Sequence, residues 1–226
     1  MTKILFQGDD FGFTRGVTLG IVDSIDRGVL RNTGLFANMP SAEFAASFMK
    51  DRPQVCFGID FNLVAGPSCA DPKDIPHLVD ENGNFIKSGV RVRDERWQSE
   101  EGRAELFPYE EVRTELLAQF NRFIELTGRK PEYLHEHSIS SENYRKVIRE
   151  LSVEHDIPYS MEVHAKLHAD KAMHSLMENS LASNKKVFDP NDQLNKDTVA
   201  QFLSISDELL KNEINAFICH PGYVDA

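Results

Sequence analysis

Short apolar runs alternate along this chain with longer segments whose apolar residues recur every three or four positions. The short runs predict buried strands over residues 3–8, 29–38, 55–63, 133–139, 157–163 and 214–219. The longer segments predict amphipathic helices, two of which end at Gly28 and Gly128 and two of which begin at Ser141 and Asp197. Alternating strands and helices are typical of an α/β fold with a parallel sheet whose two faces are covered.

Two stretches do not follow this alternation. Residues 64–108 are rich in Pro, Gly, Asp and Asn and contain the only tryptophan, Trp97. Such a long stretch is either a functional lid or binding segment, or a surface excursion with short elements of its own, and the sequence leaves both open. In the second stretch, residues 164–196, the four-residue spacing of His164 and His168 favours a solvated helix face, with a pair of metal ligands on a helix as the alternative.

Length and charge narrow the class of protein. The 226 residues suit one large domain or two small ones. The formal net charge of −11 argues against nucleic acid or an anionic membrane as the main partner. The chain lacks the ~18 consecutive apolar residues of a membrane span, and its start, MTKILFQGDD, reaches two carboxylates too early for a signal peptide. We therefore expect a cytoplasmic protein.

Ionisable side chains stand at the ends of four predicted strands. In parallel α/β folds the carboxyl ends of the strands form the active-site face, so side chains there converge. The residues concerned are Asp9 and Asp10 after the first strand, Asp60 with Asn62 on the third, His135 and His137 on the fourth, and His220 after the last.

Each of these groups also has a structural explanation when taken alone. Adjacent carboxylates such as Asp9 and Asp10 are favourable near a helix N-terminus. Asp60 could be a strand-terminal turn residue, and a buried histidine such as His135 could simply bond to the backbone. Only the recurrence of such groups at several strand ends favours a functional site.

Carboxylates combined with one or two imidazoles predict a divalent metal site. The share of carboxylates favours Mg, with Mn and Zn as alternatives. Beside such a metal, Asp9 would remain as a general base and His220 as a general acid. A metal, a base and an acid are what metal-assisted hydrolysis requires.

Four motifs, taken in order, resemble the YdjC-like carbohydrate deacetylase family, which includes chitooligosaccharide deacetylases and a hopanoid-associated branch. They are GDDFG at 8–12, GIDFNL at 58–63, LHEH at 134–137 and CHPGY at 219–223. The resemblance spans the chain. It implies a single domain over residues 1–226 with a distorted, TIM-barrel-like (β/α) barrel and irregular insertions. It also implies a divalent metal and removal of acetyl groups from N-acetylated sugars.

The resemblance also implies roles for individual residues. Asp9 matches the family's base and His220 the histidine of its late His-Pro motif, an acid. We expect the metal ligands to be Asp10, Asp60 and His137, and the substrate-binding residues to be Asn62, His135 and Trp97.

The chain departs from the family pattern at two site positions. Asp60 stands where the family has a metal-binding histidine, and His135 stands where it has an aspartate. We interpret this exchange as a metal site with altered ligand types. Two other interpretations remain open: another metal-dependent hydrolase or isomerase on the same barrel, and a metal-free sugar-binding relative.

Two further expectations follow from the resemblance alone. Family members continue past the His-Pro-Gly motif with another helix and strand, so we expect the chain to be truncated after Ala226. The expected partners are an acetylated carbohydrate substrate and a second copy of the chain in a homodimer.

Overall fold

The computed structural model describes residues 2–139, 141–167, 197–211 and 213–223. The chain divides into two compact units. The smaller consists of residues 1–6 and 161–218, and the larger of residues 7–160 and 219–226.

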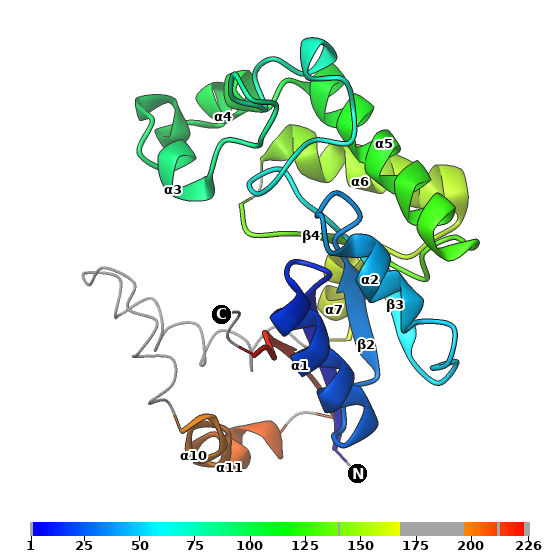
Figure 1. The fold of residues 1–226 in the computed structure, drawn as a ribbon. Coiled ribbons are helices and arrows are strands. Elements are labelled where there is room, and N and C mark those ends of the chain that lie inside the picture. The colour runs from blue at the N-terminus through cyan, green and yellow to red at the C-terminus, as the bar shows by residue number, and fades with distance from the viewer. Residues whose placement is uncertain (1, 140, 168–196, 212, 224–226) are drawn as a thin grey trace. The chain divides into compact units, whose positions relative to one another are not determined.

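A parallel sheet forms the centre of the fold (Figure 1). Its described strands follow the order β4-β3-β2-β1-β5, and neighbours from β1 to β4 pair in parallel. This confirms the predicted α/β class. The described residues supply five strands, fewer than the eight of a closed TIM barrel. The strands are β1 (Lys3–Phe11), β2 (Asn32–Leu35), β3 (Cys56–Phe61), β4 (Leu134–Glu136) and β5 (Ile214–Cys219).

In the larger unit, α-helices connect the strands, and α5 and α6 lie side by side (Figure 1). Two of the predicted helix boundaries are confirmed. Gly128 ends α5 with a φ of 70°, and the Ser141 side chain caps α6 by accepting the backbone N–H of Tyr144. The helices are α1 (Arg15–Asp26), α2 (Ala42–Ser47), α3 (Ser88–Arg91), α4 (Glu100–Leu106), α5 (Tyr109–Thr127) and α6 (Glu142–His155).

The smaller unit has its own apolar cluster. Leu209 and Phe217 are buried there, and Phe6, Phe202 and Ile205 pack against them. The predicted cap at Asp197 is confirmed, because its side chain accepts the backbone N–H of Ala200. The described helices here are α10 (Thr198–Ser204) and α11 (Ser206–Leu209), and most of α7 (Ser160–Lys166) also belongs to this unit.

The predicted strand over residues 157–163 is wrong. Tyr159 makes an isolated bridge to Leu134, and α7 begins at the next residue. Pro158 has no N–H to donate to a sheet, although its carbonyl accepts the N–H of Leu134. A short apolar run fits a strand or a helix equally well, and here the backbone turns into a helix.

The prediction of a solvated face at His164 is also wrong. His164 does lie on a helix, α7, but it is only 4% exposed. His168, the second residue of that prediction, lies outside the described residues.

The irregular stretch at residues 64–108 has short elements of its own, and its role as a binding segment stays a prediction. Besides α3 and α4 it contains the 3₁₀ helices η1 (Pro72–Asp74) and η2 (Glu95–Gln98). Two isolated antiparallel bridges, Pro67 to Asn84 and Val79 to Phe85, fold its first part back on itself.

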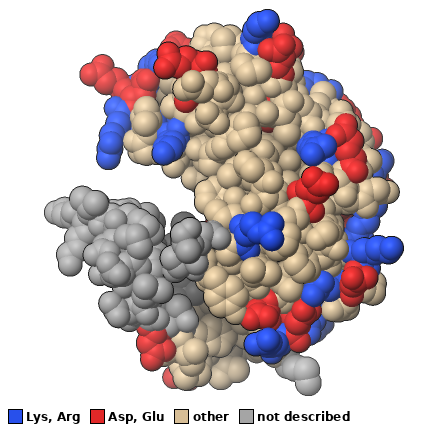
Figure 2. Space-filling view, in the orientation of Figure 1, with Lys and Arg blue, Asp and Glu red and all other residues tan. Residues whose placement is uncertain are grey.

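Charged side chains of both signs lie on one face of the protein. On the face shown in Figure 2, acidic and basic side chains lie interspersed, and neither sign gathers in one area. Within the described residues, no helix combines the length and the apolar character needed to cross a membrane.

Candidate metal and active site

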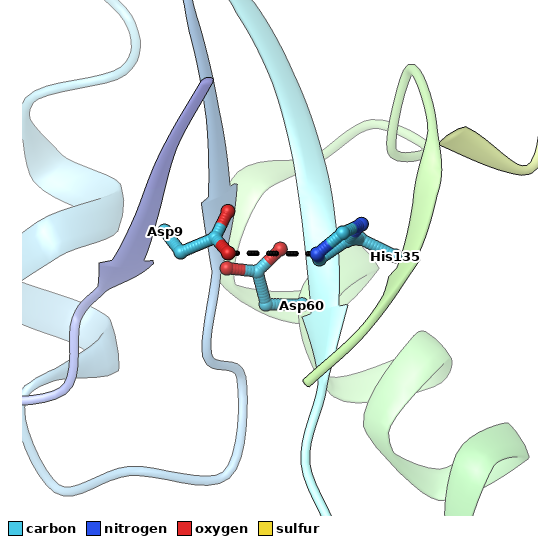
Figure 3. Close-up of side chains that lie close together, drawn as sticks. All are labelled: Asp9, Asp60 and His135. Carbon is cyan, nitrogen blue, oxygen red and sulfur yellow. Dashed lines mark ion pairs between the residues drawn. The ribbon is translucent and has the colours of Figure 1, made fainter. Parts of the chain in front are cut away.

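Three buried side chains from three strands meet within the sheet (Figure 3). They are Asp9 on β1, Asp60 on β3 and His135 on β4, and one ligand atom of each lies within 4.8 Å of the others. Asp60 and His135 are direct partners in the parallel register. Asp9 Oδ2 lies 3.5 Å from His135 Nε2.

Gly34 on β2 makes room for this meeting. A Cβ atom at Gly34 would fall 1.8 Å from Asp60 Oδ1, well inside van der Waals contact. Because β2 lies between β1 and β3, a side chain at this position would keep Asp60 away from the carboxylate of Asp9. The glycine is therefore a steric requirement of the site.

Asp60 is fully buried, and only one of its two carboxylate oxygens accepts a hydrogen bond from the described residues. Its Oδ2 accepts the backbone N–H of Asp10 at 3.2 Å, while its Oδ1 has no hydrogen-bond partner among the described residues. Burial, together with the nearby negative charge of Asp9, raises the pKa of Asp60 well above its usual value. A buried carboxylate oxygen without a partner is costly, and a cation beside it would remove that cost.

Asp9 and His135 form a buried ion pair. Burial works to raise the pKa of Asp9, but His135, the Gln7 amide at 2.8 Å and the charge of His220 lower it below its usual value. Burial likewise works to lower the pKa of His135, but Asp9 raises it to about 9. His135 Nδ1 lies 2.6 Å from Ser160 Oγ, which orients the ring so that Nε2 faces Asp9.

Asp10 and His137 form a second pair that is more open. Asp10 Oδ1 lies 3.4 Å from His137 Nδ1, and the side chains are 21% and 19% exposed. Burial and the charge of Asp9 raise the pKa of Asp10 to about 6, and burial lowers the pKa of His137 to about 4. His137 is therefore neutral at pH 7, which is the form that binds metals.

The backbone at Asp10 is strained. Its φ of 73° lies in the left-handed region, which costs a residue with a side chain about 1–3 kcal/mol. The bond from its N–H to Asp60 helps to hold this conformation. Such strain is typical of functional sites, and it aims the Asp10 carboxylate at His137.

The remaining residues expected at the site lie in different surroundings. Asn62 is fully buried, and both its amide protons and its oxygen bond to neighbouring loop residues: Asn38, Val64 and Ala65. Trp97 in η2 packs edge-on against Phe107 and beneath Arg103. His220 follows β5 and is exposed, and its charge acts on both Asp9 and Asp10.

The structure thus groups the residues differently from the sequence analysis. Among the described residues, the ligand atoms that lie within 4.8 Å of one another belong to Asp9, Asp60 and His135, not to the expected trio of Asp10, Asp60 and His137. Asp60 reaches the second pair through the backbone N–H of Asp10. His135, expected to bind substrate, lies against Asp9. Sequence reasoning missed three supporting residues: Gln7, Gly34 and Ser160. Gln7 had a usable signal, because it lies two positions before Asp9 and so shares its face of the strand.

Comparisons with known proteins agree on one family. A family model described as "YdjC-like protein" matches residues 3–226. A carbohydrate deacetylase of Geobacillus stearothermophilus is 30% identical, over 98% of this chain and 80% of its own length. One from Clostridium beijerinckii is 26% identical, over 99% and 83%. A chitooligosaccharide deacetylase of Proteus mirabilis is 31% identical, over 59% and 48%.

A solved structure shares the fold. A crystal structure of a putative cellobiose-phosphate cleavage protein from Enterococcus faecalis superimposes with a TM-score of 0.71 at 22% identity. The match covers 99% of this chain and 82% of the other. At this identity the likeness concerns the fold alone.

Proposed function

Since the chain belongs to the YdjC-like family, we propose that it is a metal-dependent carbohydrate deacetylase that hydrolyses the acetamide group of an N-acetylated sugar. One observation carries the proposal. Asp60, fully buried and with one carboxylate oxygen unpartnered, lies beside two Asp–His pairs at strand ends. Relatives named carbohydrate deacetylase and chitooligosaccharide deacetylase support the choice of substrate.

We further propose that Asp10, Asp60 and His137 hold the cation, with Mg as the expected ion and Mn and Zn as alternatives. Asp10 Oδ1 and Asp60 Oδ1 are buried atoms that lack hydrogen-bond partners among the described residues, which suits metal ligands. A catalytic metal needs an open position for substrate, and the side chains of Asp10 and His137 are partly exposed. When bound, the cation would polarise the amide carbonyl and lower the pKa of a water molecule.

The other site residues would handle protons. Asp9, ionised and held by Gln7, accepts the proton of the attacking water. His135 pairs with the Asp9 carboxylate and keeps it in place. His220 donates a proton to the leaving amine. The sheet and its helices would belong to a distorted (β/α) barrel, which the superposition with the Enterococcus faecalis protein supports.

Matched histidine variants test the ligand assignment. His137→Gln should lose the bound ion. His135→Gln makes the same substitution in the more deeply buried pair with Asp9, and this variant should keep the ion. Elemental analysis of the purified variants gives the metal content. The opposite result would assign the metal to the buried group of Asp9, Asp60 and His135. A wild-type protein that binds no Mg, Mn or Zn would contradict metal dependence altogether.

Asp9→Asn tests the role of the base. This variant should retain the ion and lose about 10²- to 10⁴-fold in kcat, the usual contribution of a general base. The measurement is acetate release from N-acetylglucosamine oligosaccharides. Unchanged turnover in this variant would refute the role assigned to Asp9.

A further inference from the structure

A cavity of about 580 Å³ lies in the larger unit, in the loops that follow the strands. Phe13 and Met39 come from the loops after β1 and β2, and the rest of the lining comes from the excursion at residues 64–108, which follows β3. Its apolar lining consists of Phe13, Met39, Ala65, Phe85, Ile86 and Val90.

One residue of the cavity lining, Phe13, links the cavity to the candidate active site. The backbone N–H of Phe13 donates to the carbonyl of Asp10 at 2.9 Å. The Phe13 ring lies 5.8 Å from the ring of Phe36, which in turn meets the His137 ring edge-on at 4.7 Å. Phe13 therefore connects the cavity lining to Asp10, and Phe36 connects it to His137.

Backbone carbonyls around the cavity are already used within the protein. The Ala65 carbonyl accepts the side-chain amides of Asn38 and Asn62. The Gly66 carbonyl accepts the N–H of Phe85 at 2.8 Å.

The lining also includes three polar side chains, and none of them is buried. Asp80, Asn84 and Lys87 are all exposed, and Asp80 Oδ1 accepts the backbone N–H of Asn84. Against the apolar residues of the lining, the hydroxyl groups of a sugar ring would lack hydrogen-bond partners, which is costly. Burial of a hydrocarbon chain against the same residues would be favourable.

We propose that this cavity binds an alkyl group carried by the amino-sugar substrate. The inference rests on the proposed function. The alkyl group has two chemical sources, an N-acyl chain longer than acetyl and an alkyl aglycone on the anomeric oxygen. In the first case hydrolysis breaks the C–N bond, the water oxygen ends in the released carboxylate, and the nitrogen leaves as the amine.

Calorimetric binding of two ligand series tests the proposal. The first series is the methyl, butyl and hexyl glycosides of glucosamine, which carry no amide. The second is N-acetyl-, N-butanoyl- and N-hexanoylglucosamine with the Asp9→Asn variant, which should leave the amide intact. The series that reaches the cavity should bind about fourfold tighter for each fully buried CH₂ group.

A pair of exposed valines supplies the matched variants. Val90 lines the cavity and is 58% exposed, while Val92 is 40% exposed and is not part of the lining. Val90→Asp should remove most of the gain for the hexyl or hexanoyl ligand and leave the shortest ligand unchanged. Val92→Asp should behave like the wild type.

The outcomes separate this inference from the proposed function. Equal binding of short and long ligands in both series would overturn the cavity assignment, as would equal effects of the two valine variants. Because binding is measured without turnover, a chain-length effect in a protein that deacetylates nothing would preserve the cavity and refute the deacetylase activity.

Discussion

Gly34 has no side chain and contributes no chemistry, yet it decides whether the site can form. The Asp60 carboxylate occupies the space that a Cβ atom at Gly34 would need. Across Gly34 on β2, the Asp60 carboxylate lies near Asp9 on β1. On the opposite side, Asp60 pairs in register with His135 on β4. A single missing methyl group thus allows three ionisable side chains from three strands to meet.

Gly34→Ala should therefore displace Asp60 and weaken metal binding by at least about tenfold, the size of effect seen when residues supporting a metal ligand are lost. Overpacking at this buried position should also cost about 1–3 kcal/mol of unfolding free energy. Titration calorimetry with the metal and urea unfolding measure the two effects. Gly89→Ala is the control, because a Cβ there meets nothing within 4 Å; equal behaviour of the two variants would contradict the steric argument.

Among the elements, helix α5 holds the loop after β3 in position. Glu115 is fully buried, and its two oxygens accept the backbone N–H groups of Cys69 and Ala70. One turn on, Gln119 both accepts the N–H of Asn62 and donates to its carbonyl. One helix face thereby fixes the segment that leaves β3 next to Asp60.

Glu115→Ala should lower the unfolding free energy by about 1–3 kcal/mol, because it leaves buried backbone N–H groups without acceptors. The exposed Glu125→Ala on the same helix should stay within about 0.5 kcal/mol of the wild type. Urea unfolding compares the two variants. A Glu115 variant as stable as the Glu125 variant would show that the loop does not depend on this anchor.

At the scale of the whole molecule, the candidate site belongs to one unit. All of its ionisable residues lie in the larger of the two compact units. The protein also carries a net charge of −11, and two carboxylates, Asp9 and Asp60, are buried beside one another at this site. A divalent cation should therefore stabilise the larger unit in particular.

Metal at a hundred times its dissociation constant should add about 2.7 kcal/mol to the stability of the state that binds it. Scanning calorimetry should show the transition of the larger unit moving to higher temperature with metal and back after chelation. Asp60→Asn supplies the control, since it removes the proposed ligand. A shift of the same size in that variant would place the stabilising ion elsewhere.

The sequence by itself determined the class of fold and pointed to the ionisable residues at the strand ends. The alternation of apolar runs with amphipathic segments was enough to predict the parallel sheet. The last strand, Ile214–Cys219, has the predicted boundaries. Capping residues such as Ser141 and Gly128 act locally, so their effect could be read without a structure. The ionisable strand ends were likewise visible, because carboxylates directly after apolar runs require a partner.

Tertiary structure alone decided how those residues pair. Asp9 and His135 are far apart in sequence and lie on strands that are not neighbours, so their contact depends on sheet order, on register and on the space above Gly34. The run at residues 157–163 also needed the structure, because a short apolar segment fits a strand or a helix until its neighbours are placed. Local patterns fix local conformation, whereas distances between side chains on different strands arise only when the chain packs.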